Sequence, residues 1–302
     1  MQPQTDDYGT QGRSEWLDVD WRAHLHSIVL HGSRVNYVEM GEGPPVVFVH
    51  GLSGCWQNWL ENIPHFARRH RAIAVDLAGF GHSELPQEEI SIPGYGRFMD
   101  AFLGEIGVER GALIGNSMGG FVSAETAITH PGRVDKLVLV SAAGGPRLQE
   151  RNTTNGNHVV RGARLFSPLA AAAFARRSEL VRRPRLRRAL LWKVARHPEL
   201  LRPELCYEVA SGASKPGFMN ALQAIFDYDF GERIPEIECP TLIVWGRNDE
   251  IVPVDDAYEY ARLIPGARME IFEDTGHLPM LERPARFNRM VEEFLEEDPS
   301  SE

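Results

Sequence analysis

The sequence has few cysteines and no long apolar run. Its three cysteines, Cys55, Cys206 and Cys239, lie far apart and are odd in number, which excludes a disulfide framework and the usual ligand spacing of a metal site. No stretch approaches the ~20 consecutive apolar residues of a membrane span. The N-terminal residues are polar and acidic and lack the basic and apolar regions of a secretory signal peptide, so we expect a cytoplasmic protein.

Motifs that bind nucleotides or metal ions are also missing. The sequence has no H-E-x-x-H and no Walker loop, and GFGHSE at 79–84 lacks the last glycine of G-x-G-x-x-G. We therefore expect no metal and no other cofactor. The net charge of −10 and the lack of a recognition motif argue against a nucleic-acid partner.

Short apolar runs recur along the chain and predict an open, mostly parallel α/β sheet. Such nearly continuous runs are typical of strands buried on both faces, and helical patterns fall between them. Segments 25–31 and 33–39, which precede the runs, predict an antiparallel hairpin. The runs are 45–50, 72–76, 112–115, 136–142, 241–246 and 268–272. The helical patterns are at about 56–69, 97–107, 118–130, 255–264 and 284–296.

One long segment interrupts this alternation. Residues 146–231 contain no strand-like run but several helical patterns, so we expect a helical cap, or lid, inserted between two strands of the sheet. The α/β core then consists of residues 21–145 and 232–302. Residues 1–20 are expected to form a mobile N-terminal tail.

Ser117 stands in a frame of glycines, GNSMGG, directly after an apolar run. At a sharp strand-to-helix turn, side chains at positions 115 and 119 would collide with the neighbouring strand and helix, and Gly120 would let the helix pack closely on the sheet. The serine would lie at the N-terminus of that helix, where backbone amides and the helix dipole favour negative charge. The motif therefore predicts a nucleophile.

A serine hydroxyl needs a base, and the base needs an acid that orients it. His277 is the only histidine beyond the last predicted strand, and Asp249 follows the run 241–246. The resulting order of nucleophile, acid and base is the order that this architecture requires. Glu250, Asp255 and Asp256 compete for the role of the acid, but the last two are better placed to begin the following helix.

A tetrahedral intermediate also needs hydrogen-bond donors for its oxyanion. The backbone N–H of Met118, next to the serine, is one candidate. The second is the backbone N–H of Leu52, in the HGLSG loop after the run 45–50. We expect His50 to hold that loop in place and Cys55 to be a packed residue rather than a nucleophile.

With these motifs the chain resembles the α/β-hydrolase superfamily, in its esterase and lipase-like serine hydrolase branch, across about residues 25–296. The resemblance implies the fold and the Ser-His-Asp triad, and it makes His82 a structural residue. A serine at position 117 argues against haloalkane dehalogenases and epoxide hydrolases, which carry aspartate there. The motifs are HGLSG, DLAGFGHS, GNSMGG, HPGRVDKLVLVSA, WGRNDEIVP and GHLPMLERP.

The leading hypothesis is a carboxylic ester hydrolase that forms an acyl-enzyme on Ser117 and accepts an apolar acyl group, because the predicted cap is rich in leucine and phenylalanine. The alternative is a carbon–carbon bond hydrolase of the meta-cleavage-product type. Those relatives usually carry tryptophan after the catalytic histidine, where this chain has Leu278. Cofactor-free peroxidase activity, acyl transfer and non-hydrolytic ligand binding stay open.

The predicted cap is strongly basic. Residues 146–205 carry fourteen basic and four acidic side chains, a net charge of +10 in a chain whose total is −10. Such a separation of charge creates a field that attracts anions. The sequence thus raises the hypothesis of an anionic partner at the cap, such as a carboxylate-bearing ester, an acidic carrier protein or an anionic lipid surface.

Overall fold

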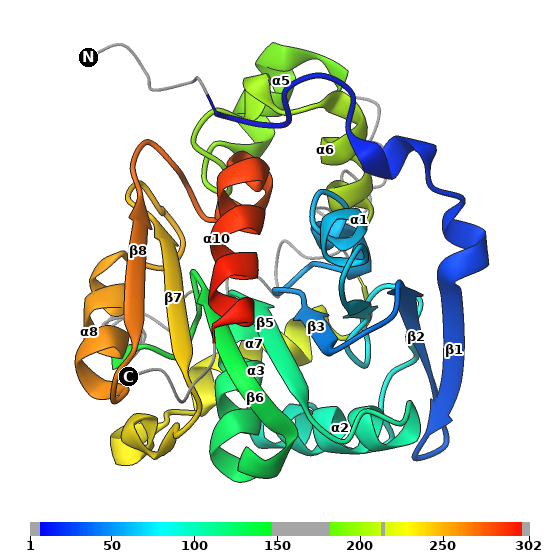
Figure 1. Ribbon diagram of the computed structural model, residues 1–302, viewed down its shortest axis with the longest axis vertical. Helices are drawn as coiled ribbons and strands as arrows, with labels where there is room; N and C mark the ends of the chain where they lie inside the picture. The colour runs from blue at the N-terminus through cyan, green and yellow to red at the C-terminus, as the bar shows by residue number, and fades with distance from the viewer. Residues whose placement is uncertain (1–6, 147–181, 213–214, 298–302) are drawn as a thin grey trace.

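The computed structural model describes residues 7–146, 182–212 and 215–297 and is built on an eight-stranded sheet (Figure 1). The strand order is β1-β2-β4-β3-β5-β6-β7-β8. β1 and β2 form the expected antiparallel hairpin, β2 pairs antiparallel with β4, and all other pairs are parallel. The predicted mostly parallel sheet is therefore confirmed. The strands are β1 Leu25–Leu30, β2 Ser33–Met40, β3 Pro45–Val49, β4 Arg71–Val75, β5 Gly111–Asn116, β6 Val134–Val140, β7 Thr241–Gly246 and β8 Arg268–Phe272.

Side chains that alternate along the central strands are buried on both faces of the sheet. On β3, Val47 and Val49 belong to one hydrophobic cluster, while Val46 and Phe48 belong to another on the opposite face. Helices α2 Ile92–Glu105, α3 Met118–Thr129 and α8 Asp255–Leu263 contribute to the first cluster. Helices α1 Ile63–Phe66 and α10 Pro284–Glu296 contribute to the second. The result is the three-layer arrangement that continuous apolar strands predict.

Two helices differ from their predicted extents. The helix expected at 56–69 is broken into the 3₁₀ turn η3 Trp56–Trp59 and the short α1, because Pro64 has no N–H to donate to the turn before it and fits only the first turn of a helix. Helix α2 begins at Ile92, earlier than expected, where Ser91 caps it by accepting the Gly94 N–H at 3.1 Å. Within the described residues, every helix falls short of the length and apolar character that a bilayer span requires.

The expected helical cap lies between β6 and β7. Its described part consists of α5 Pro184–Leu191, η6 Pro198–Leu200, α6 Pro203–Ser211 and α7 Phe218–Asp227. Helices α5 and α6 lie at the top of the molecule in Figure 1, and α7 lies lower, close to α2. The insertion of helices between sheet strands is confirmed, whereas the part of the predicted cap at 147–181 lies outside the described residues.

The N-terminal segment differs from the mobile tail expected for residues 1–20. From residue 7 onward it packs against the body, with Tyr8 and Trp16 only 4% and 7% exposed. The Tyr8 hydroxyl donates to Glu282, and the Trp16 indole donates to Glu61 at 3.0 Å. Two aromatic anchors therefore hold a segment whose polar composition predicted mobility. The short elements of this region are η1 Glu15–Asp18 and η2 Trp21–His24.

Candidate active site

Ser117 occupies a strained turn between β5 and α3. Its backbone has φ +56° and ψ −120°, a conformation that residues other than glycine rarely adopt. Two hydrogen bonds to the neighbouring β6 region hold it there: the Ser117 N–H donates to the Val140 carbonyl at 2.9 Å, and the Ser117 carbonyl accepts the Ala143 N–H at 3.0 Å. Such a turn lifts the serine side chain away from both the strand and the helix.

The glycines around Ser117 are required by close packing. A Cβ atom added to Gly115 would overlap the Gly119 carbonyl, and one added to Gly119 would overlap the Val49 carbonyl at the end of β3. A Cβ atom on Gly120 would lie only 2.5 Å from the Cβ of Ala142. These collisions with the neighbouring strand, helix and sheet are the ones that the sequence motif predicted.

Asp249 and His277 lie side by side at the carboxyl ends of β7 and β8. Their side chains are 0% and 5% exposed, and His277 Nδ1 is 2.7 Å from Asp249 Oδ2. The other Asp249 oxygen, Oδ1, accepts the N–H groups of Ile251 and Val252 at 2.8 and 2.9 Å. A carboxylate only accepts hydrogen bonds, so Nδ1 carries the imidazole proton and Nε2 has the lone pair that a general base needs.

The backbone of His277 is fixed from two directions. Its N–H donates to the carbonyl of Val194 in the cap at 3.0 Å, and its carbonyl accepts from Asn116 Nδ2 at 3.2 Å. Asn116 directly precedes Ser117. The structure thus joins the predicted base to the nucleophile turn on one side and to the cap on the other.

The loop after β3 lies against the nucleophile turn. A Cβ atom on Gly51 would be 3.0 Å from the Cβ of Ser117, so the backbone of this loop directly contacts the serine. In the described part of the chain, neither the Leu52 N–H nor the Met118 N–H donates to a protein acceptor. The binding of an oxyanion by these two amides stays a prediction.

His50 holds this loop in shape. Its Nε2 accepts the Leu77 N–H at 3.0 Å, so the imidazole is neutral and its Nδ1 donates to the Gly51 carbonyl at 2.8 Å. Burial lowers the pKa of His50, while the nearby Asp76 acts in the opposite direction. This is the structural role that the sequence predicted for His50.

The turn between α6 and α7 packs on the loops around the site. A Cβ atom on Gly212 would lie 2.9 Å from Cys55 Sγ, and the Gly217 N–H donates to the Gly79 carbonyl at 3.0 Å. Burial raises the pKa of the Cys55 thiol to about 12, so at neutral pH it stays protonated and is a poor nucleophile, as expected from the sequence. These contacts place this part of the cap against the loops that contain Cys55 and Gly79.

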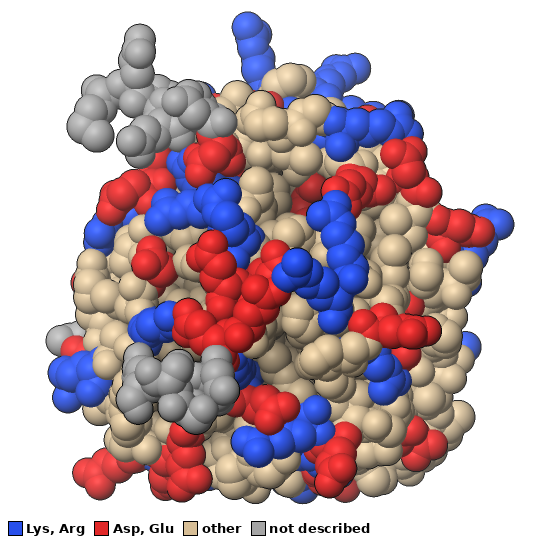
Figure 2. All heavy atoms as spheres, viewed as in Figure 1, with Lys and Arg blue, Asp and Glu red and all other residues tan. Residues whose placement is uncertain are grey.

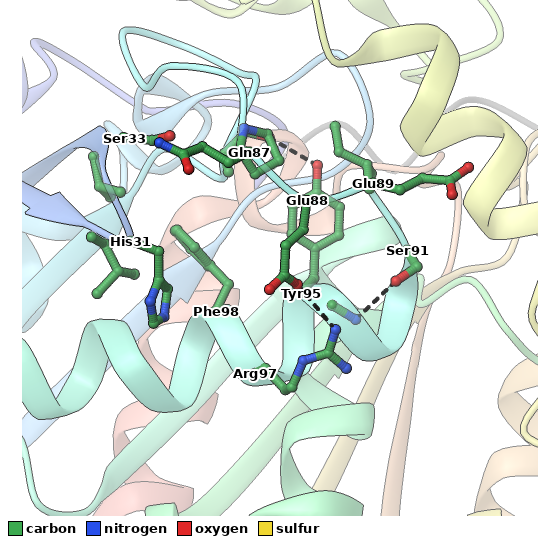
Figure 3. A pocket seen from close by; sticks show the side chains of 15 residues that line it. His31, Ser33, Gln87, Glu88, Glu89, Ser91, Tyr95, Arg97 and Phe98 are labelled. Atoms are coloured by element: carbon green, nitrogen blue, oxygen red, sulfur yellow. Dashed lines mark hydrogen bonds and ion pairs between the residues drawn. The ribbon is translucent and has the colours of Figure 1, made fainter.

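A pocket lies away from Ser117 (Figure 3). It encloses about 210 Å³ between the β1–β2 hairpin, the 86–91 loop and the first turns of α2. The Tyr95 hydroxyl donates to the Ala78 carbonyl at 2.9 Å across its wall. Ser117, Asp249 and His277 do not line this pocket, which is therefore separate from the predicted catalytic residues.

The competing acids lie elsewhere. Glu250 and Asp255 are exposed, and Asp255 and Asp256 begin α8, as their position in the sequence predicted. The catalytic roles assigned to Ser117, Asp249 and His277 stay predictions, now with a geometry that brings their segments together.

Three buried side chains to which the sequence motifs assign no role support these segments. Asp76 accepts the Trp56 N–H at 2.8 Å and the His82 N–H at 2.9 Å, which ties together two loops beside the site. Asn116 and Glu282 hold the backbone around His277. All three lie inside the quoted motifs, but a motif does not indicate which backbone groups a buried polar side chain will reach.

Known proteins that are similar to this chain agree with this fold, and the similarity covers most of the chain. The family model described as alpha/beta hydrolase fold matches residues 44–284. A 2-hydroxy-6-oxononadienedioate/2-hydroxy-6-oxononatrienedioate hydrolase of Cupriavidus pinatubonensis is 31% identical over 290 residues, covering 92% of this chain and 92% of that relative.

Solved structures are similar over nearly the whole chain as well. The meta-cleavage product hydrolase CumD of Pseudomonas fluorescens is 27% identical with a TM-score of 0.69, covering 89% of this chain and 97% of that one. An N-acyl homoserine lactone degrading enzyme is 26% identical with a TM-score of 0.68, covering 89% of this chain and 100% of that one. With its strained serine turn, its parallel sheet and a family match over more than half its length, the chain belongs to the alpha/beta hydrolase fold family.

Proposed function

We propose that this protein is a serine hydrolase that cleaves a carbon–carbon bond in a 2-hydroxy-6-oxo-dienoate. The observation that carries the proposal is the 31% identity, over 92% of both chains, with a hydrolase named for such a dienedioate. The similarity to a meta-cleavage product hydrolase structure points the same way. The ester hydrolase that the sequence alone favoured becomes the second candidate.

The geometry fits a two-step reaction. Ser117 Oγ attacks the ketone carbon while its proton passes to His277 Nε2, and the N–H groups of Leu52 and Met118 bind the oxyanion. The substrate reacts in its keto form, in which the 2-hydroxyl proton has moved to the carbon next to that ketone. The bond between these two carbons then breaks, its electron pair leaves as a conjugated dienolate, and the His277 proton is delivered to the dienolate oxygen. Water, deprotonated by His277, releases the acid from Ser117, and Asp249 stabilises the imidazolium in both steps.

A dicarboxylate substrate would give the basic cap a role. Residues 182–202 contain eight basic side chains and a single acid. Of these basic side chains, Arg183, Arg185, Arg188 and Lys193 are exposed, and basic groups project from the top of the molecule, where α5 lies (Figure 2). We propose that their field attracts the anionic substrate.

Arg187 does not belong to this exposed group. It is only 3% exposed, and its guanidinium donates to the carbonyls of Pro198 and Glu199 at 2.7 Å each. It therefore joins α5 to η6 rather than adding to the surface charge.

Leu278 supports the second candidate, an ester or lactone hydrolase with an apolar acyl group. It follows His277 directly, at the position where meta-cleavage product hydrolases usually carry tryptophan, and it is 6% exposed. Relatives that act on dienoates usually have an aromatic ring beside the histidine at this position, and the aliphatic side chain of Leu278 does not provide one. The same triad can hydrolyse an ester without any change of role.

One substrate panel separates the two candidates. The wild type and Ser117→Ala would be assayed on 2-hydroxy-6-oxo-dienoates, followed by loss of dienoate absorbance, and on p-nitrophenyl esters of increasing acyl length. We expect kcat/KM for the best dienoate to exceed that for the best ester by about 100-fold, which is a large difference in transition-state binding. The reverse ratio would establish the ester hydrolase, and turnover that survives Ser117→Ala would overturn both.

A further inference from the structure

Glu282 holds the backbone on both sides of His277. It ends the short helix α9 (Pro279–Glu282), and it is 0% exposed. Its Oε1 and Oε2 atoms accept the Gly276 N–H at 3.0 and 2.9 Å, and Oε1 also accepts the Leu278 N–H at 3.1 Å. One buried carboxylate thus binds the residues immediately before and after the predicted base.

The same carboxylate joins two other parts of the molecule. Oε2 accepts the Arg196 N–H from the cap at 2.8 Å and the Tyr8 hydroxyl from the N-terminal segment at 2.6 Å. The Tyr8 oxygen in turn accepts the His197 N–H at 2.8 Å. Segments that are far apart in the sequence therefore meet on one side chain next to His277.

This arrangement favours the ionised form of Glu282, because its four partners, Gly276, Leu278, Arg196 and Tyr8, all donate. Burial raises the pKa of Glu282, and the hydrogen bonds from Tyr8 and from the three backbone N–H groups counteract that rise. Burial also raises the pKa of Tyr8, so its hydroxyl keeps the proton that it donates.

The cap makes a direct contact with this segment. The His277 N–H donates to Val194, and a Cβ atom on Gly276 would lie 2.9 Å from the Arg196 nitrogen. A displacement of the 194–197 segment would therefore displace the histidine backbone. Because side chains in catalysis must be placed to within fractions of an ångström, such a shift would lower the rate of the chemical step.

We propose that Glu282 is a positioning residue for His277, and that through Tyr8 and Arg196 it makes the placement of the base depend on the docked N-terminal segment and cap. This inference rests on the proposed function of His277 as the general base. It assigns a functional role to a segment that the sequence alone marked as a mobile tail.

Three variants test the proposal. Glu282→Gln keeps the size of the side chain, but its amide nitrogen cannot accept. Tyr8→Phe removes only the hydroxyl that donates to Glu282. The matched control, Tyr95→Phe, removes another buried tyrosine hydroxyl. That hydroxyl donates to the carbonyl of Ala78, which is far from His277 in the sequence.

Five quantities are measured: thermal stability, kcat, KM, the pH profile of kcat, and the downfield NMR resonance of the His277 Nδ1 proton bonded to Asp249. We expect kcat to fall about 10-fold to 100-fold in Glu282→Gln and about 3-fold to 10-fold in Tyr8→Phe, with little change in KM. The resonance should broaden or shift in both. The acidic limb of the Tyr8→Phe profile should move to higher pH, because Glu282 has lost a hydrogen bond that lowers its pKa.

The control should lose stability without changing kcat, the pH profile or the resonance. The proposal is overturned if the two test variants behave in the same way as this control. If Glu282→Gln does not fold, Tyr8→Phe decides. Failure of the proposed function would be a separate result, seen as a wild type that does not hydrolyse the substrates. If that wild type still shows the His277 resonance, the effect of the variants on the resonance tests the positioning role by NMR alone.

Discussion

Asn116 Nδ2 lies 3.2 Å from the carbonyl oxygen of His277, so the residue before the predicted nucleophile holds the backbone of the predicted base. The same nitrogen is 3.1 Å from the Val140 carbonyl at the end of β6. Asn116 and His277 are 161 residues apart in the sequence. Their relative position is thus fixed by a buried side chain as well as by the sheet.

Replacing Asn116 with alanine should misplace His277. The variant removes the side-chain donor to the buried His277 carbonyl, whereas the Val140 carbonyl keeps the Ser117 N–H. We therefore expect the free energy of unfolding to fall by about 1–3 kcal/mol and kcat to fall about tenfold or more. Urea denaturation and steady-state kinetics measure both. Asn288→Ala, which removes an amide that donates to the Glu61 carbonyl, should lose stability only. An unchanged kcat in Asn116→Ala would contradict this role.

Asp249→Asn should leave the fold intact and lower kcat by about 10⁴-fold, because an amide at this position favours the wrong imidazole tautomer. The neighbouring Glu250 is exposed, so Glu250→Gln should retain kcat within about twofold, as most surface changes do. The comparison also tests the assignment of the acid. A severe loss in Glu250→Gln together with a mild effect in Asp249→Asn would move the acid by one residue.

His50 should make the protein less stable at mildly acidic pH. Burial lowers its pKa in the fold, whereas the unfolded chain binds a proton there below about pH 6.5. The unfolded state then holds more protons, so the free energy of unfolding should decrease as the pH falls, by up to about 1.4 kcal/mol per pH unit from this residue.

Urea denaturation between about pH 7.5 and pH 5.5 measures this slope, because this pH interval spans the histidine titration range. The slope should be smaller in His50→Gln than in the wild type. His70, whose pKa burial also lowers, contributes equally to both proteins and does not affect the comparison. Equal slopes in the two proteins would show that His50 is not the group responsible.

Reversing the exposed charge of the cap should weaken the capture of an anionic substrate. In the triple variant Arg183→Glu, Arg185→Glu and Arg188→Glu, kcat/KM for a dianionic dienoate should fall about tenfold or more at low salt and lose its salt dependence. Hydrolysis of a small neutral ester should be unchanged. Arg187 is left in place because it is buried and joins α5 to η6.

A control variant with the same total change of charge reverses three exposed arginines outside the cap. These are Arg22, Arg97 and Arg289. If the cap acts through its local field, this control should keep most of the wild-type kcat/KM for the dienoate. Equal losses in the two triple variants would assign the effect to net charge, and no loss in either would leave the cap arginines as a solvated surface.

The sequence predicted the elements that carry the site because each predicted catalytic residue follows a predicted strand. Ser117, Asp249 and His277 come after β5, β7 and β8, and the carboxyl ends of parallel strands meet at one edge of a sheet. The glycines beside Ser117 could also be interpreted correctly, because their close contacts arise from the local turn and its neighbouring strands.

The supporting contacts could not be predicted in this way. Asn116 reaches His277 across 161 residues, Tyr8 reaches Glu282 across 274, and Glu282 reaches the Arg196 N–H across 86. Local periodicity contains no information about such pairs. The polar composition of the N-terminal residues likewise hid the two aromatic side chains, Tyr8 and Trp16, that anchor the segment to the body.

The central claim is that Ser117 is a nucleophile activated by His277, and covalent labelling tests it most directly. The folded wild type would be treated with a fluorophosphonate probe at neutral pH and digested, and the modified peptide would be identified by mass spectrometry, with Ser117→Ala and His277→Ala as parallel samples. We predict one label on Ser117, none in Ser117→Ala, and labelling slowed by about 10³-fold or more in His277→Ala, since triad members act as a unit. A folded wild type whose Ser117 is not labelled, or is labelled equally fast without His277, would contradict the account.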